Sequence, residues 1–487
     1  MKRYLRIIVI GFTIVGLAHF FLIEYLGWLT PIAFIAIVAI VFRQFKNEDS
    51  VWDLVLILFV CHHFWLGENR GGTLSYIVLL AGVVYILRAG ILKRFPDGPV
   101  LKLVLFVIAI NVIAGYIHTG FAYIDQVFYG LVILFSTFVT FKMVSGFELS
   151  EERLKDIAVV GSIMIVYMAL VTINQRFSFI APSSYVAFLP PSNRDLGPMG
   201  ELLPAQSDDA GALLSALVRP LGTFYHFELT GEYGLLFFLF LLPFFFYRDR
   251  IMRARTIAVV AFCSLFIVFN TLNRGPILLL PFAYLGGLLL TRFLDHTKMK
   301  LQVFFVPLLF LMPLVLFPEF VELTGVYQRL TGGDAFVGGV PGTRIGIWDQ
   351  VIPKLSEIPL TGLGMRPGYF MEQNFIGVAP HSLYLALPFY YGWIGGILFV
   401  SLIVVTTFRL FSAGVRKSVA SHLRFASVGL FLFFVAFLID QYKIDILRQV
   451  QYQHLIWFYI GFAASVLKTA RRTRKEPLVP DTTSQTG

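Results

Sequence analysis

Long apolar runs separated by short charged segments dominate this chain and leave few possibilities for its fold. A helix needs about 20 apolar residues to cross a bilayer. Fourteen runs approach that length, at residues 7–23, 27–42, 51–67, 72–92, 101–121, 123–141, 157–175, 229–247, 256–272, 276–291, 301–317, 382–408, 425–440 and 454–467. Apolar side chains make up 57% of the 487 residues, so little is left for a water-soluble domain. We therefore expect an all-α polytopic membrane protein with about 14 transmembrane helices, within a range of about 12 to 14.

The charged connections between these runs predict the orientation of the chain. With Met1 placed inside, 28 of the 39 lysine and arginine residues fall on the inner side and 11 on the outer side. Basic residues concentrate on the cytoplasmic side of membrane proteins, so we expect both termini in the cytoplasm. The basic excess behind the net charge of +10 is then explained by its role in orienting the chain in the membrane. It does not indicate a nucleic-acid partner, and none is expected.

Two long connections, both predicted to be external, organise the chain. The expected segments are N-terminal transmembrane helices (1–175), a periplasmic loop (176–228), further transmembrane helices (229–317), a periplasmic catalytic loop (318–380), C-terminal transmembrane helices (381–467) and a cytoplasmic basic and disordered tail (468–487). No phosphate-binding glycine-rich motif of the nucleotide-hydrolysing type occurs in the chain. Any chemistry is therefore expected on the outer side.

The second external loop contains the densest polar signals. Ile345, Trp348 and Ile352 recur at helical spacing, which predicts a short amphipathic helix that Arg344 opens. Arg344 also fits a solvated loop charge, and Trp348 fits an interfacial anchor better than a ligand contact. His381 enters the next apolar run, where a hydrogen-bonded interfacial histidine and a functional one are equally good interpretations.

Arginine, rather than lysine, dominates the basic residues predicted to lie outside. Arg274 lies between two apolar runs with no real loop to solvate it, which favours a cavity or a partner. Arg219 fits a functional role and contact with lipid headgroups equally well. The nine external arginines are Arg70, Arg176, Arg194, Arg219, Arg274, Arg329, Arg344, Arg366 and Arg448. A guanidinium grips phosphate with paired donors, so a diphosphate is a natural ligand.

These residues suggest glycosyl transfer without a metal or cofactor. If Arg274 and Arg344 hold the diphosphate of a lipid-linked sugar, the diphosphate becomes a stabilised leaving group. His381 could then accept the proton of an attacking sugar hydroxyl. Cys61 and Cys263 lie inside apolar runs, and no histidine or cysteine spacing predicts a metal site.

Four segments in the same order resemble the O-antigen ligase and O-antigen polymerase superfamily of bacterial membrane proteins. The segments, spread over residues 215–400, are Asn273-Arg274-Gly275, Gly342-Thr343-Arg344 with Trp348, the turn Pro359-Leu360-Thr361-Gly362-Leu363-Gly364, and Pro380-His381-Ser382-Leu383-Tyr384 with Gly392, Gly395 and Gly396. The family often has serine where this chain has Asn273 and asparagine where it has Ser382. Neither departure removes a proposed catalytic group.

The resemblance implies a metal-independent glycosyltransferase of the bacterial inner membrane with a periplasmic active site. Its donor would be an undecaprenyl-diphosphate-linked glycan. The family's functional positions carry over to Arg274, Arg344 and His381, and we assign substrate binding to Arg219, Trp348, Tyr384 and Arg366. Membrane lipids and a chain-length regulator are further expected partners.

Three alternatives remain beside the favoured function, which is a polymerase of exopolysaccharide or O-antigen. A ligase would use the same donor and transfer the glycan to lipid A core. A flippase for lipid-linked oligosaccharides would need charges deep in the spans of both halves of the chain. Acid-dependent ion transport is disfavoured because the sequence suggests no buried carboxylates of the kind it requires.

Overall fold

The computed structural model of the chain is helical throughout the part that it describes, with no β-strand there. That part comprises residues 2–23, 36, 39–40, 43, 48–64, 71–89, 99–119, 124–177, 220–224, 226–246, 251–271, 273–295, 344–363, 382–442 and 446–475. In a bilayer, a spanning backbone must satisfy its own hydrogen bonds, and apolar runs of this length do so as α-helices.

Helices occupy twelve of the fourteen predicted spans. They are α1 (Lys2–Ile23), α3 (Glu48–Cys61), α4 (Gly71–Ala89), α5 (Pro99–Thr119), α6 (Ile124–Ser145), α7 (Glu151–Phe177), α9 (Phe227–Phe246), α10 (Ala254–Asn270), α11 (Arg274–Asp295), α17 (Leu383–Val415), α18 (Ser421–Asp440) and α19 (Val450–Lys475). The predicted span at 301–317 and most of that at 27–42 lie outside the described residues, as do most of the two long predicted loops. Within the described ranges, four helices, α7, α9, α17 and α18, are both long and apolar enough to cross a membrane.

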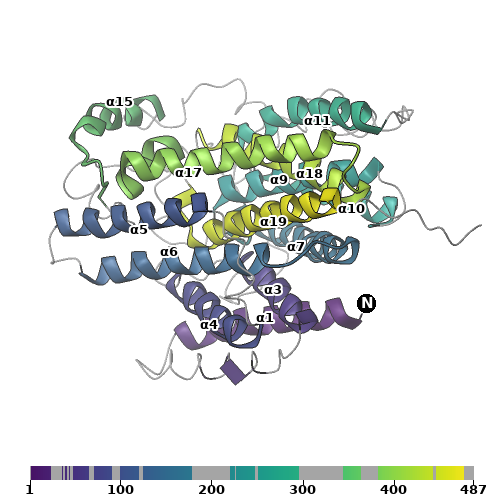
Figure 1. Cartoon of the computed structure of the whole chain (residues 1–487), viewed down its shortest axis with the longest axis horizontal. Coiled ribbons are helices and arrows are strands. Elements are labelled where there is room, and N and C mark those ends of the chain that lie inside the picture. Colours follow the sequence, from purple (N-terminus) through teal and green to yellow (C-terminus); the bar gives the residue numbers. More distant parts are fainter. Residues whose placement is uncertain are drawn as a thin grey trace, which may run out of the picture.

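The centre of the described bundle is α9. In its apolar window 94% of the residues are buried, against 33% in α17, so α9 is an interior helix and α17 is peripheral. α9 packs against α10, α11 and α18, while α19 packs against α6, α17 and α18. The axes of α5, α6, α17 and α19 lie nearly parallel in Figure 1, with the label for the N-terminus at the opposite end of the view from α15.

A short helix, α15 (Arg344–Lys354), lies in the predicted catalytic loop and begins at Arg344. The short 3-10 helix η5 (Leu355–Glu357) continues it. The buried face of α15 differs from the predicted one, which included Ile352. In the structure Val351 is buried, whereas Ile352 is 53% exposed. Trp348 is half-buried.

The turn that follows α15 is attached to α17. The backbone N–H of Leu363 donates to the carbonyl of Phe389 over 2.6 Å. Gly362 and Gly392 meet at this contact, and both have a positive φ, of 76° and 70°. A side chain at either position would collide with the other segment, so two of the glycines noted in the sequence permit this close approach.

Candidate functional site

The residues predicted to form the site differ in how much the structure describes of them. Arg274 is the first residue of α11 and Arg344 is the first residue of α15, although their side chains are outside the described set. Arg219, Arg366 and His381 lie outside the described residues altogether. Ser382, which follows His381, is the N-cap of α17, and Tyr384 lies in the first turn of that helix.

The start of α11 is fixed to the start of α9 by Asn273. This side chain is buried, and its Nδ2 donates to the carbonyl of Glu228 over 2.9 Å. Its Oδ1 accepts the backbone N–H of Gly275 over 3.4 Å. Gly231 allows the approach, because a Cβ there would lie 3.2 Å from that of Asn273. Asparagine serves here as donor and acceptor at once, which holds the backbone on both sides of Arg274.

The start of α17 is fixed to the end of α18. The backbone N–H of Leu383 donates to the carbonyl of Gln441 over 3.0 Å, which satisfies one of the free N–H groups of a helix start. The hydroxyl of Tyr384 donates to the carbonyl of Leu438. We assign Tyr384 to substrate binding from the sequence, but its hydroxyl proton is already donated to this carbonyl. A ligand could therefore meet only its ring or its oxygen lone pairs.

Trp348 holds α15 against the same end of α18. Its ring lies edge-on to that of Tyr442, with 4.9 Å between the ring centroids. Edge-to-face aromatic pairs contribute about 0.5–1.5 kcal/mol beyond the burial of their area. This contact agrees with the interpretation of Trp348 as an anchor.

A buried carboxylate, Glu232 on α9, joins these helix ends. It is fully buried, with one carboxylate oxygen accepting the Nε2 of Gln441 and the other accepting the hydroxyl of Tyr452, each over 2.8 Å. Tyr452 lies in the first turn of α19. The first two turns of α9 therefore connect directly to the start of α19 and the residue that follows α18.

The expectation of no buried carboxylates was wrong, because Glu232 is fully buried and Asp440, the last residue of α18, is 1% exposed. The sequence interpretation missed both because each lies at the edge of an apolar run. The signal was nevertheless present, since an ionisable residue inside such a run indicates a functional or paired group.

The N-terminal turns of α9, α11, α17 and α19 are thus linked at one end of the bundle, where α15 also attaches. Helix N-termini carry partial positive charge and free N–H groups. Four of them lie at this end with the arginines that begin α11 and α15, and these groups are suited to bind an anion, whereas the buried carboxylates of Glu228, Glu232 and Asp440 at the same end oppose it. A diphosphate is an anion of suitable charge.

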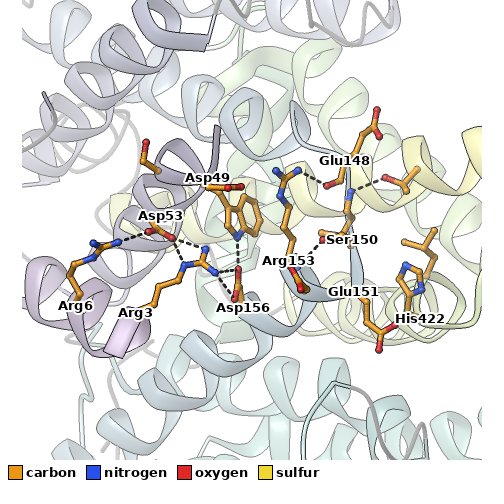
Figure 2. Close-up of a pocket in the computed structure, with 16 residues that line it drawn as sticks. Arg3, Arg6, Asp49, Asp53, Glu148, Ser150, Glu151, Arg153, Asp156 and His422 are labelled. Atoms are coloured by element: carbon orange, nitrogen blue, oxygen red, sulfur yellow. Dashed lines mark hydrogen bonds and ion pairs between the residues drawn. The ribbon is translucent and has the colours of Figure 1, made fainter. Parts of the chain in front are cut away.

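A polar cavity of about 1070 Å³ lies where the starts of α1, α3, α7 and α18 meet the end of α19. All five segments were predicted to be on the inner side. Figure 2 shows Arg3 between Asp53 and Asp156 in this cavity, with Arg6 on the far side of Asp53. Arg3 lies 2.7 Å from a carboxylate oxygen of Asp53 and 3.1 Å from one of Asp156, and Arg6 lies 2.9 Å from Asp53.

Asp156 ties three helices together at this cavity. Besides Arg3, it accepts the hydroxyl of Tyr4 and the indole N–H of Trp52, each over 2.8 Å. Burial and the hydrogen bond to Asp156 raise the pKa of Tyr4 to about 12, so it remains a donor across the physiological pH range. Because the buried carboxylates already have partners, this cluster fastens α1 and α3 to α7.

Replacing Asp156 by alanine is expected to destabilise the protein by about 1–3 kcal/mol, since the buried N–H of Trp52 loses its acceptor. The measurement is the thermal midpoint of the purified protein in detergent. Asp49→Ala is the matched control, because Asp49 lines the same cavity but is exposed. Equal midpoints for the two variants would contradict the assigned role.

Neither the protein-family models nor the curated protein sequences that were compared with this chain give a match.

Proposed function

We propose that this chain is a membrane glycosyltransferase that moves an undecaprenyl-diphosphate-linked glycan onto a sugar hydroxyl at the periplasmic face of a bacterial inner membrane. In this proposal it has about 14 transmembrane helices and cytoplasmic termini. Its most favoured role is polymerisation of an exopolysaccharide or O-antigen. One observation carries the proposal: the starts of α11 and α17 are linked at one end of the bundle. The start of α11 bears Arg274, and the start of α17 follows His381 in the sequence.

The chemistry assigned to this end needs only side chains and helix N-termini. Arg274 and Arg344 bind the diphosphate and stabilise the charge that develops on it as the bond to the anomeric carbon breaks. The acceptor hydroxyl attacks that carbon from the opposite side and forms the new glycosidic bond. Its proton passes to His381, and undecaprenyl diphosphate leaves. Arg219 and Arg366 are proposed to contact the substrate around these groups.

The placement of buried charge favours a transferase over a flippase. Among the described residues, the buried charged side chains lie within two turns of a helix end; these are Asp53, Lys142, Asp156, Glu228, Glu232 and Asp440. A flippase would need charges along a path through the membrane interior. Polymerase and ligase share the donor chemistry and differ in acceptor, so both remain within the proposal.

Purified protein in proteoliposomes tests the proposal directly. With an undecaprenyl-diphosphate-linked repeat unit as donor, we expect release of undecaprenyl diphosphate and formation of longer glycans, seen by gel and mass spectrometry. Lipid A core offered as acceptor distinguishes a ligase, which would transfer glycan to it alone. Movement of intact donor across the bilayer, with no consumption in the presence of either acceptor, would overturn the transferase in favour of a flippase.

A further inference from the structure

Glu232 lies where the two halves of the proposed site are held together. We infer that it is a positioning residue, which sets the start of α17, two residues after His381 in the sequence, relative to the start of α11, whose first residue is Arg274. This inference rests on the proposed function for its catalytic consequence. It concerns a residue that the sequence interpretation did not select.

The first half of the argument is the connection from Glu232 to α17. One carboxylate oxygen of Glu232 accepts the Nε2 of Gln441 over 2.8 Å. The backbone carbonyl of the same Gln441 accepts the N–H of Leu383 over 3.0 Å. Leu383 is the first residue of α17 and follows His381 by two positions. A single glutamine residue therefore connects the carboxylate to the segment that bears the proposed base.

The second half is the connection from Glu232 to α11. Glu228 lies four residues before Glu232 on α9, so the two occupy the same face of the helix one turn apart. The carbonyl of Glu228 accepts the Nδ2 of Asn273, which precedes Arg274. One rigid turn of α9 thus fixes the separation between the two connections.

The chemistry of the carboxylate suits this role. Both of its oxygens are engaged, by Gln441 on one side and by Tyr452 on the other, and the side chain is fully buried. Burying an ionisable group inside an apolar bundle costs free energy, which an apolar side chain of similar volume would avoid. The group is therefore explained better by the geometry that it imposes than by stability alone.

Two substitutions separate positioning from other roles. Glu232→Ala leaves the donors of Gln441 and Tyr452 without their acceptor and removes a hydrogen-bonded connection between α9 and the residue that follows α18. Glu232→Gln retains an acceptor for Tyr452, and the amide of Gln441 can turn over to accept from the new glutamine. A displacement of about 1 Å costs about a hundredfold in rate. We therefore expect kcat to fall about a hundredfold in Glu232→Ala, with little change in the donor KM, and to be largely retained in Glu232→Gln.

A matched control and a double variant complete the kinetic test. Tyr233→Phe removes hydrogen bonds from the adjacent buried residue, whose hydroxyl contacts His63 and Tyr459 rather than the start of α17. We expect its kcat to stay near that of the wild type. Gln441→Ala combined with Glu232→Ala should cost about as much as Glu232→Ala alone, because Glu232→Ala already removes the hydrogen bond to Gln441. Equal losses in Glu232→Ala and Glu232→Gln would overturn positioning in favour of a role for the charge itself.

A distance measurement tests the inference without relying on activity. Spin labels at positions 278 of α11 and 385 of α17 report the separation of the two helix starts by pulsed electron paramagnetic resonance. Glu232→Ala should broaden or shift the distance distribution, and Glu232→Gln should leave it as in the wild type. An unchanged distribution in Glu232→Ala would overturn the inference. If the distribution broadens in Glu232→Ala but the wild-type protein transfers no glycan, the positioning role is supported and the proposed function is contradicted.

Discussion

Replacing Arg344, Arg274 or His381 by alanine is expected to reduce glycan transfer by at least about a hundredfold each, with the amount of protein in the membrane unchanged. Removing one stabilising donor from a developing charge costs about 10²–10³ in kcat, and removing a general base costs about 10²–10⁴. Arg274 and Arg344 begin α11 and α15, where the helix N-termini would add to the positive field on a diphosphate bound as proposed. The measurement is donor turnover in proteoliposomes.

Conservative variants, and a control variant at another cationic residue, make this prediction more specific. Lysine at position 274 or 344 keeps the charge but loses the paired donors, so partial activity is expected. Lys354→Ala should have little effect, because Lys354 lies at the other end of α15 and pairs with Glu357 over 2.9 Å near the surface. Full turnover in both Arg344→Ala and His381→Ala would contradict the mechanism.

The positions of the helices could be predicted because each apolar run is bounded by charges. The ends of the helices were predicted less accurately. α7 begins at Glu151, six residues before the predicted span at 157, and α19 continues to Lys475, into the basic part of the predicted tail (468–487). Hydropathy identifies the part of a helix that prefers lipid, whereas the backbone continues into water when caps allow. Glu151 and Glu152 favour such a start because carboxylates interact well with a helix N-terminus.

Candidate site residues could be selected from the sequence only where they carry a local signal. Arg274 was noticed because it lies between two apolar runs, and Arg344 because it opens a predicted amphipathic helix; both begin helices in the structure. The connections of Glu232 could not be recognised from the sequence, because its partners Gln441 and Tyr452 lie 209 and 220 positions away along the chain. A long-range hydrogen bond leaves no periodic pattern, so the connection between the two halves of the site required the folded chain.

Gly392→Ala is expected to cause the largest loss of stability among the substitutions considered. Gly392 has φ 70° and ψ 172° inside α17, a backbone conformation that is essentially restricted to glycine and costs another residue about 1–3 kcal/mol. A Cβ there would also overlap the carbonyl of Leu360 and lie 2.8 Å from the backbone nitrogen of Gly362. Because these are backbone atoms, no side chain can move aside, and the turn after α15 must separate from α17. The thermal midpoint in detergent should fall by several degrees.

The same substitution tests whether the attachment of α15 matters for transfer. Separation of the turn would remove one contact that holds α15, and with it Arg344, on α17, while the contact of Trp348 with Tyr442 remains. We therefore expect glycan transfer in Gly392→Ala to fall even at temperatures where the protein remains folded. Gly286→Ala is the matched control, because a Cβ at Gly286 on α11 meets nothing within 4 Å and alanine favours a helix by about 1 kcal/mol over glycine. A midpoint for Gly392→Ala as high as that of Gly286→Ala would contradict the close contact between the turn and α17, and with it the route by which α15 is held at the site.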